Sequence, residues 1–181
     1  MKKKILWITE TAALLALLIT LQILTKPAGQ LVTGSFVNAV LAISVLTAGI
    51  GSGIAVAVLS PVLAYLLGIA PQILTVPAIM AGNCVFVAVL YFVAGKDGRK
   101  YFRQLAAWLS AAVAKFAVLY AVVVWLICGV FADALLAAGM LKAPMLKTLP
   151  AMFSLAQLIT ALIGGAVALI IAPVVRKALK R

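Results

Sequence analysis

Apolar residues in this chain form long runs that polar residues interrupt only at a few short stretches. The first run covers residues 5–25, and at about 1.5 Å per residue a helix of this length spans about 31 Å. That length matches the hydrocarbon layer of a bilayer, which is about 30 Å thick. Residues 76–94 and 152–175 form similar runs, and 105–138 forms a longer one. The pattern therefore predicts helices that cross a membrane.

Residues 36–68 leave two alternatives open. The run 36–48 is short for a crossing, and glycines at 49, 51 and 53 predict a tight turn before the next run, 54–68. Two short helices and one re-entrant hairpin fit this pattern equally well. Both return the chain to the same side of the membrane, so the orientation of the later segments does not depend on the choice.

The polar stretches between the runs predict loops. Residues 26–35 include Pro27, Gly29 and Gly34, which break helices, so we expect a structured loop there. Residues 141–150 are expected to form a second loop, and the long run 105–138 is expected to break near Gly129.

The composition supports a membrane protein. Hydrophobic residues make up 67% of the 181 positions and charged residues 10%, whereas soluble domains have about 45–50% and about 25%. Too few polar residues remain to cover so apolar a chain in water. The predicted fold is all-α, a polytopic membrane protein with about six transmembrane helices, and residues 1–181 are expected to form a single integral membrane domain.

The positive charges predict how the chain is oriented. Eleven of the fifteen Lys and Arg residues lie in three clusters, at 2–4, 96–103 and 176–181, and each cluster flanks an apolar run. The opposite side of the predicted topology carries Lys26, Lys142 and Lys147. Since cytoplasmic loops are richer in Lys and Arg, both termini are predicted to be cytoplasmic and the loops 26–35 and 141–150 external. Topology thus accounts for the net charge of +12, and we expect no nucleic-acid partner.

Residues suited to catalysis are scarce. The chain has no His, its two Cys residues are isolated, and it has neither paired carboxylates nor a phosphate-binding loop. We therefore expect no catalytic residues and no metal-binding residues, and we expect that the protein is not an enzyme. Without a nucleotide-binding motif the chain needs no cofactor of its own, so any ATP is expected to be used by partner subunits.

Polar side chains inside a bilayer are costly, so they mark candidate sites. Counting from the predicted ends puts Asn83 and Gln157 about 8–11 Å below the outer surface, and Lys115 near mid-depth. These three could meet in the outer half of the membrane, although the two amides could equally serve as hydrogen bonds between helices. Glu10 and Gln22 also lie in the first run. Gln30 and Thr33 in the predicted external loop, and Asn38 just after it, add further polar groups. The candidate binding residues are therefore Gln30, Thr33, Asn38, Asn83, Lys115 and Gln157, and the family resemblance described below implies that they bind a substrate.

The first run also carries small residues on one helical face. Ala12 and Ala16 are four positions apart, a spacing that lets a second helix approach closely. This face fits packing within the monomer and docking of a partner equally well.

Several of these features together resemble the substrate-binding S components of energy-coupling-factor (ECF) transporters, the vitamin importers of bacteria and archaea. They are six short hydrophobic segments, the alanine pair, the segment 29–38 (GQLVTGSFVN) and the segment 77–83 (PAIMAGN). The resemblance implies a subunit in a prokaryotic cell membrane that captures a vitamin or related small molecule at the outer face. It also implies that Ala12 and Ala16 dock onto a transmembrane coupling subunit, itself joined to two ATP-binding subunits.

Lys115 suggests the charge of that substrate. Asp133 is the only acidic residue toward the outer side, and about eighteen helical positions separate it from Lys115, or about 27 Å. A buried ammonium needs an acceptor, so we expect an anionic or strongly electronegative ligand group to face Lys115. The alternative function is a channel or secondary transporter for small solutes that works alone, as an oligomer.

The predicted orientation can be tested with single cysteines introduced at positions 142 and 147. We expect a membrane-impermeant thiol reagent to label both from outside the cell, because both positions are predicted to be external. Labelling from the cytoplasmic side alone would overturn the topology.

Overall fold

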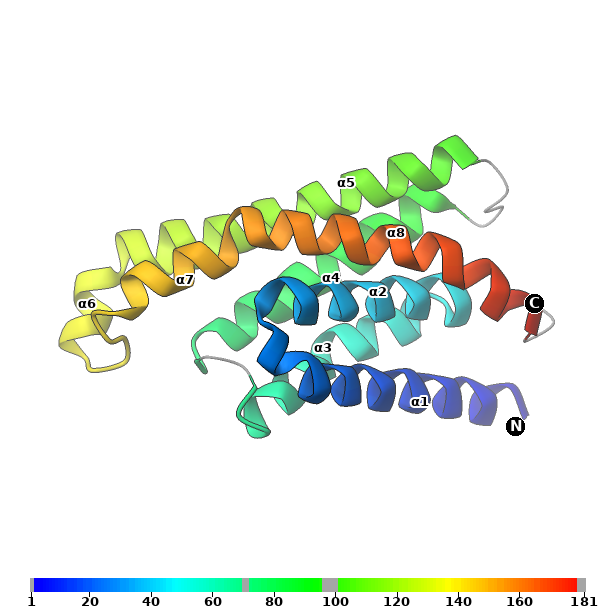
Figure 1. The fold of residues 1–181 in the computed structure, drawn as a ribbon, viewed down its shortest axis with the longest axis horizontal. Helices are drawn as coiled ribbons and strands as arrows, with labels where there is room; N and C mark the ends of the chain where they lie inside the picture. The colour runs from blue at the N-terminus through cyan, green and yellow to red at the C-terminus, as the bar shows by residue number, and fades with distance from the viewer. Residues whose placement is uncertain (1, 70–71, 96–100, 179–181) are drawn as a thin grey trace.

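The structure is a computed structural model that describes residues 2–69, 72–95 and 101–178, and it is helical with no strand in these ranges (Figure 1). This confirms the all-α fold of a polytopic membrane protein. Five helices are long and apolar enough to cross a membrane, while Ile50–Leu66 is shorter, within the part of the chain that is described. The elements in order are α1 Lys2–Thr25, η1 Lys26–Ala28, α2 Gln30–Ala48, α3 Ile50–Leu66, α4 Thr75–Ala94, α5 Tyr101–Leu119, η2 Tyr120–Val130, α6 Ala132–Ala137, α7 Met145–Phe153 and α8 Leu155–Ala178.

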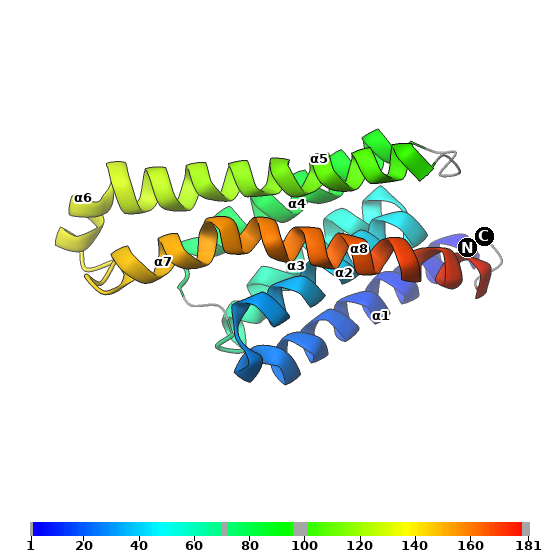
Figure 2. The ribbon, with the colours of Figure 1, turned by 45° about the horizontal axis from the view of Figure 1, so that its top comes forward.

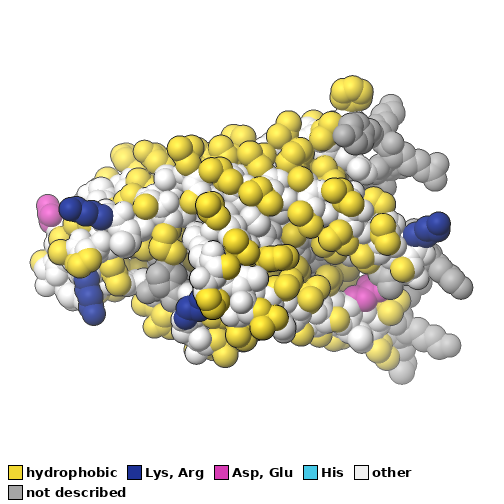
Figure 3. Space-filling model, in the orientation of Figure 1, with side chains coloured by type: hydrophobic (Ala, Val, Ile, Leu, Met, Phe, Trp, Pro, Cys, Tyr) yellow, Lys and Arg dark blue, Asp and Glu magenta, His cyan; other side chains and the backbone are white. Residues whose placement is uncertain are grey.

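The long helices run back and forth along the longest axis of the molecule (Figures 1 and 2). Both termini lie at one end of the bundle, and α6 lies at the other. Hydrophobic side chains cover the middle of the surface in Figure 3, whereas Lys and Arg side chains appear at its two ends. A bilayer requires this distribution, because its apolar interior solvates hydrocarbon and excludes charge.

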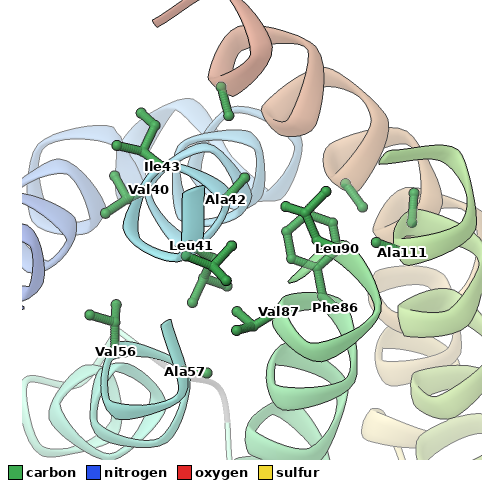
Figure 4. Packing of buried hydrophobic residues seen from close by; sticks show 14 of the residues in the cluster. Val40, Leu41, Ala42, Ile43, Val56, Ala57, Phe86, Val87, Leu90 and Ala111 are labelled. Atoms are coloured by element: carbon green, nitrogen blue, oxygen red, sulfur yellow. The ribbon is translucent and has the colours of Figure 1, made fainter. Parts of the chain in front are cut away.

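Helix α2 lies at the centre of the bundle. It packs against α1, α3, α4 and α8, and every residue from Asn38 to Val45 is buried. Figure 4 shows Leu41 of α2 facing Val56 of α3 and Phe86 and Val87 of α4. A helix that is buried on nearly all sides has no face on which a charge could reach water, which accounts for the absence of charged residues from α2.

Glycines allow α2 and α8 to approach closely. A Cβ at Gly164 would collide with the carbonyl oxygen of Ser35 and lie 2.6 Å from the Cβ of Asn38. On the facing helix, a Cβ at Gly34 would lie 2.9 Å from Thr160. The absent side chains therefore bring the backbones together, as small residues do in membrane bundles.

The predicted loop at residues 26–35 is wrong for its second half. Only η1 and Gly29 separate α1 from α2, which begins at Gln30. Gly29 has a φ of 87°, a value that L residues with side chains rarely adopt, so the turn is made at this one glycine. Gly34 lies within α2, where it admits Thr160 and does not break the helix.

Residues 36–68 form parts of two helices, as both alternatives for this segment require. Helix α2 reaches 19 residues because it includes residues 30–35. The turn between α2 and α3 is made by Gly49 alone, with a φ of 87°, and α3 starts at the next residue. Gly53 lies inside α3, where a Cβ would contact Val87 and Val45. Gly53 therefore allows close packing, although the sequence pattern predicted it to be part of the turn.

The second predicted loop, 141–150, is also largely helical. Helix α7 covers Met145–Phe153, and α8 begins at Leu155 and not at residue 152. Leu149 and Phe153 are buried against a small cluster with Leu119 and Val123, so burial of its apolar side stabilises α7. The break expected near Gly129 is found at Phe131, where η2 ends. The basic cluster at 96–103 lies mostly outside the described residues.

Replacement of Gly164 by Ala tests the close approach of α2 and α8. We expect the variant to lose about 1–3 kcal/mol of stability, because the new methyl group meets backbone atoms that cannot move aside. Thermal unfolding in detergent measures the loss. The control is Gly129→Ala, where the new Cβ has only one ordinary contact, 3.6 Å from the Val124 oxygen. Equal unfolding midpoints for the two variants would show that α2 and α8 are not tightly packed.

Candidate functional site

A cavity of about 110 Å³ is lined by residues from the C-terminal parts of α1 and α3 and the N-terminal parts of α2 and α4, among others. In Figure 1 these helix ends lie away from both termini of the chain. Residues from α1, α2, α3, α4, α5, α7 and α8 line it, which places it where the long helices converge. Its apolar wall comprises Val37, Pro61, Ala64, Ile69, Ile79, Met152 and Phe153. All six predicted substrate-binding residues line the same cavity: Gln30, Thr33, Asn38, Asn83, Lys115 and Gln157.

Lys115 is the charged group of this cavity. Its side chain is only 2% exposed, and its Nζ donates hydrogen bonds to Asn38 Oδ1 at 2.6 Å and Asn83 Oδ1 at 2.7 Å. The ammonium also lies 5.6 Å from the centroid of the Phe86 ring, within the range of a cation–π interaction. Two neutral carbonyl oxygens and one aromatic face therefore solvate a charge that water barely reaches.

The helix sequences explain why these three side chains meet. On α5, Ala107, Ala111, Lys115 and Leu119 are buried and four residues apart, so the lysine occupies the row that faces the bundle. Next to Asn83 on α4, Gly82 provides room for Leu119, since a Cβ there would lie 2.8 Å from the Leu119 Cγ. The α4–α5 contact therefore brings Asn83 within reach of Lys115.

Hydrogen bonds orient the Asn38 side chain. Its Nδ2 donates to the Gly34 oxygen at 2.9 Å and to Thr160 Oγ1 at 3.3 Å, and Thr160 Oγ1 donates to the Gln157 oxygen at 3.1 Å. A flipped amide would direct its NH₂ group at the ammonium, so these bonds fix Oδ1 toward Lys115. The close packing of α2 on α8 thus supports the position of the buried charge.

Three residues that line the cavity have a polar atom without a partner. Asn83 Nδ2, Gln22 Oε1 and Ser60 Oγ are all buried and make no hydrogen bond within the described ranges of the chain. Such a group costs about 1–3 kcal/mol, so natural proteins seldom leave one unpaired without a reason. Hydrogen bonds to a ligand would satisfy these three residues of one cavity lining.

The predicted residues differ in how much they offer a ligand. Lys115, Asn38 and Asn83 form one hydrogen-bonded group. Gln157 donates through Nε2 to the Met152 oxygen at 3.1 Å, and Thr33 donates to the Thr25 oxygen at 2.9 Å, so both bind the ends of neighbouring segments. Gln30 lines the cavity at the first position of α2.

Two cavity residues with polar side chains, Gln22 and Ser60, were not among the predicted binding residues. Gln22 is one of the polar residues inside the first apolar run, but sequence distance gave no reason to place it with Lys115. Ser60 directly precedes Pro61 in α3. Its hydroxyl resembled an ordinary helix-interior serine, because only the fold shows that it finds no partner. The sequence signal that could have revealed both is a polar residue inside an apolar run.

The alanine pair lies on the outer face of α1. Ala12 and Ala16 are exposed, while Thr11, Leu18 and Gln22 of the same helix are buried. Helix α1 packs on α2 and α3 through the face that carries these buried residues, and Thr11 Oγ1 donates to Ser52 Oγ at 3.0 Å. Of the two alternatives for the alanine pair, packing within the monomer is therefore excluded.

Comparison with known proteins gives one match. The family described as "ECF transporter, substrate-specific component" matches residues 8–176 of the chain. The match covers all the described residues that line the cavity. Neither the curated proteins nor the solved structures gave a match.

Proposed function

The chain belongs to the family of substrate-specific components of ECF transporters, and we propose that it captures a vitamin or related small molecule in the cavity around Lys115. The family is one of transport components and not of enzymes. The observation that carries the proposal is the cavity itself, whose lining combines a largely apolar wall with a buried lysine and three residues that each have a polar atom unpaired among the described residues. Ligand sites commonly combine an apolar lining with a few convergent polar groups.

Lys115 and Asn83 supply donors for one end of the substrate. An ammonium has three N–H donors, and the two asparagine oxygens accept two of them. The unpaired Nδ2 belongs to the same Asn83 side chain, so two donors lie close together. A carboxylate or another strongly electronegative group of the substrate would accept both. It would also compensate a charge that has only neutral acceptors in the protein.

The cavity position fits capture from outside a prokaryotic cell. It lies away from the two termini, which the excess of Lys and Arg assigns to the cytoplasm. We therefore place the protein in the plasma membrane with the cavity in the outer half of the bilayer.

Energy for uptake comes from partner subunits in this proposal. We assign a transmembrane coupling subunit to the exposed face of Ala12 and Ala16, and ATP hydrolysis to two ATP-binding subunits joined to it. The small side chains support this assignment, because they allow a partner helix to approach the α1 backbone in lipid.

Reconstitution into proteoliposomes tests the proposal. We expect the protein alone to bind its substrate without transporting it, and uptake to need ATP together with the partner subunits. Uptake by this protein alone would instead establish a self-sufficient channel or secondary transporter.

Substitution of Lys115 by Met tests the role of the buried charge. The side chain keeps a similar length and loses the charge, so we expect affinity for the bound compound to fall about 10- to 100-fold. Asn83→Ala and Gln157→Ala should lose less, because each removes a neutral hydrogen-bonding group. Isothermal titration with the compound that co-purifies with the wild-type protein measures these affinities.

The control for this series is Lys147→Met, which removes an exposed lysine outside the cavity. It should bind as the wild type does. Unchanged affinity in a folded Lys115→Met protein would contradict the proposed role and leave the lysine as a hydrogen bond between helices.

Substitution of Ala12 or Ala16 by Trp tests the docking face. We expect at least a several-fold loss of ATP-driven uptake with substrate affinity unchanged, because the indole keeps the partner helix away without reaching the cavity. The matched control is Ala117→Trp, an exposed alanine on α5. Equal losses of uptake in the α1 variants and the control, or loss of binding and folding in the α1 variants, would rule out a docking role for this face.

A further inference from the structure

The unpaired Oε1 of Gln22 indicates a second chemical group of the substrate, in addition to the group that faces Lys115. We infer that the substrate carries an uncharged hydrogen-bond donor, an N–H of amide, lactam or urea type or a hydroxyl, which meets Gln22 Oε1. This inference rests on the proposed function and narrows its substrate class to neutral or anionic molecules with donor and acceptor groups at separate positions.

Gln22 can be satisfied only by a donor. Its side chain is 9% exposed, and Oε1 is buried with no hydrogen-bond partner in the part of the chain that is described. An amide oxygen accepts hydrogen bonds and never donates them. A bound molecule that presents an N–H or O–H to this oxygen would remove the cost of leaving it unpaired.

The charge of the cavity excludes a cationic donor. Lys115 is the one charged residue among the described residues of the lining, and none of these residues is acidic. An ammonium on the substrate would enter a site of low polarity that already holds a positive charge, with no counterion from the described lining. The donor that reaches Gln22 is therefore neutral.

Gln22, which needs a donor from the substrate, and Lys115, which needs an acceptor, come from different sides of the bundle. Gln22 belongs to α1 and Lys115 to α5, and these helices lie on opposite sides in Figures 1 and 2. Ser60 of α3 adds a second unpaired group, a hydroxyl that can donate or accept. A substrate that satisfies Asn83 and Gln22 together therefore needs an acceptor at one position and a donor at another.

If Gln22 had a purely structural role, its replacement would destabilise the protein without substrate. Other residues make the hydrogen bonds that join α1 to its neighbours, namely Thr11 with Ser52, and Thr25 with Thr33. Gln22→Leu has a similar size and removes an unpaired buried oxygen. Without substrate the variant should thus be as stable as the wild type or more so, although it binds more weakly.

The experiment starts from protein expressed in cells supplied with a mixture of water-soluble vitamins and their precursors. Mass spectrometry after denaturation identifies the compound retained by the wild type, and this compound is the probe for titration and thermal unfolding. We expect it to be neutral or anionic with an uncharged N–H or O–H. For Gln22→Leu we expect at least tenfold weaker binding, with an unfolding temperature of the substrate-free protein that is unchanged or raised.

An analogue of the probe with that N–H or O–H methylated should bind the wild type at least tenfold more weakly, and Gln22→Leu should no longer discriminate between the two. Thr20→Leu, an exposed position on the same helix, is the control and should bind as the wild type does. A cationic probe would overturn the inference. So would unchanged affinity in Gln22→Leu, or a lower unfolding temperature of that variant without substrate.

Lys115→Met in the same assay distinguishes a failure of the inference about the donor from a failure of the proposed function. Weaker binding in Lys115→Met with unchanged binding in Gln22→Leu overturns the inference about the donor and leaves the proposed function intact. Unchanged binding in both variants removes the cavity from the binding site. A wild type that retains no compound at all contradicts the proposed function itself.

Discussion

The structure depends on one constraint, the presence of a lysine ammonium inside a bundle of membrane helices. Removing such a charge from water is costly, and Lys115 finds compensation in two asparagine oxygens at 2.6 and 2.7 Å and in the ring of Phe86. These groups come from α2 and α4, so the charge ties α5 to both helices. Purely structural polar contacts tend to be fully satisfied, whereas this one has the unpaired Asn83 Nδ2 at its edge. Such an arrangement is suited to accept a further group from a small molecule.

The rest of the bundle positions this contact. Gly164 and Gly34 let α8 approach α2, and that approach supplies Thr160 to hold the Asn38 amide with its oxygen toward Lys115. Helix α1 lies at the edge of the same arrangement, with Gln22 toward the cavity and the small alanines toward lipid. One helix thus combines a candidate contact with the substrate and a candidate contact with a partner. The two proposed functions, capture and docking, are therefore assigned to different faces of α1.

The apolar runs predicted most of the helices, and the cost of polar groups in lipid predicted which residues meet in the cavity. Both kinds of prediction can be made from sequence because lipid as the solvent requires apolar helices and makes buried polar side chains costly. The errors concern local structure. Glycine and polar residues at 26–35 suggested a loop, but Gly29 alone makes the turn and tertiary packing allows Gly34 inside a helix. Asn83 was predicted to meet Lys115, but Asn38 was not predicted as a second acceptor, because only the fold shows that α2 brings it to Lys115. Gln22 and Ser60 could not be assigned, since an unpaired atom is visible only once its neighbours are known.

We propose that a small molecule binds in the cavity around Lys115. An experimental structure of the protein, purified with the compound it retains from cells, would show where that compound lies. We expect density for it inside the cavity, within hydrogen-bonding distance of Lys115 Nζ or Asn83 Nδ2. Density for the compound elsewhere would contradict this proposal, for example in the largely apolar groove between α2 and α8 that Phe36 and Ile163 line.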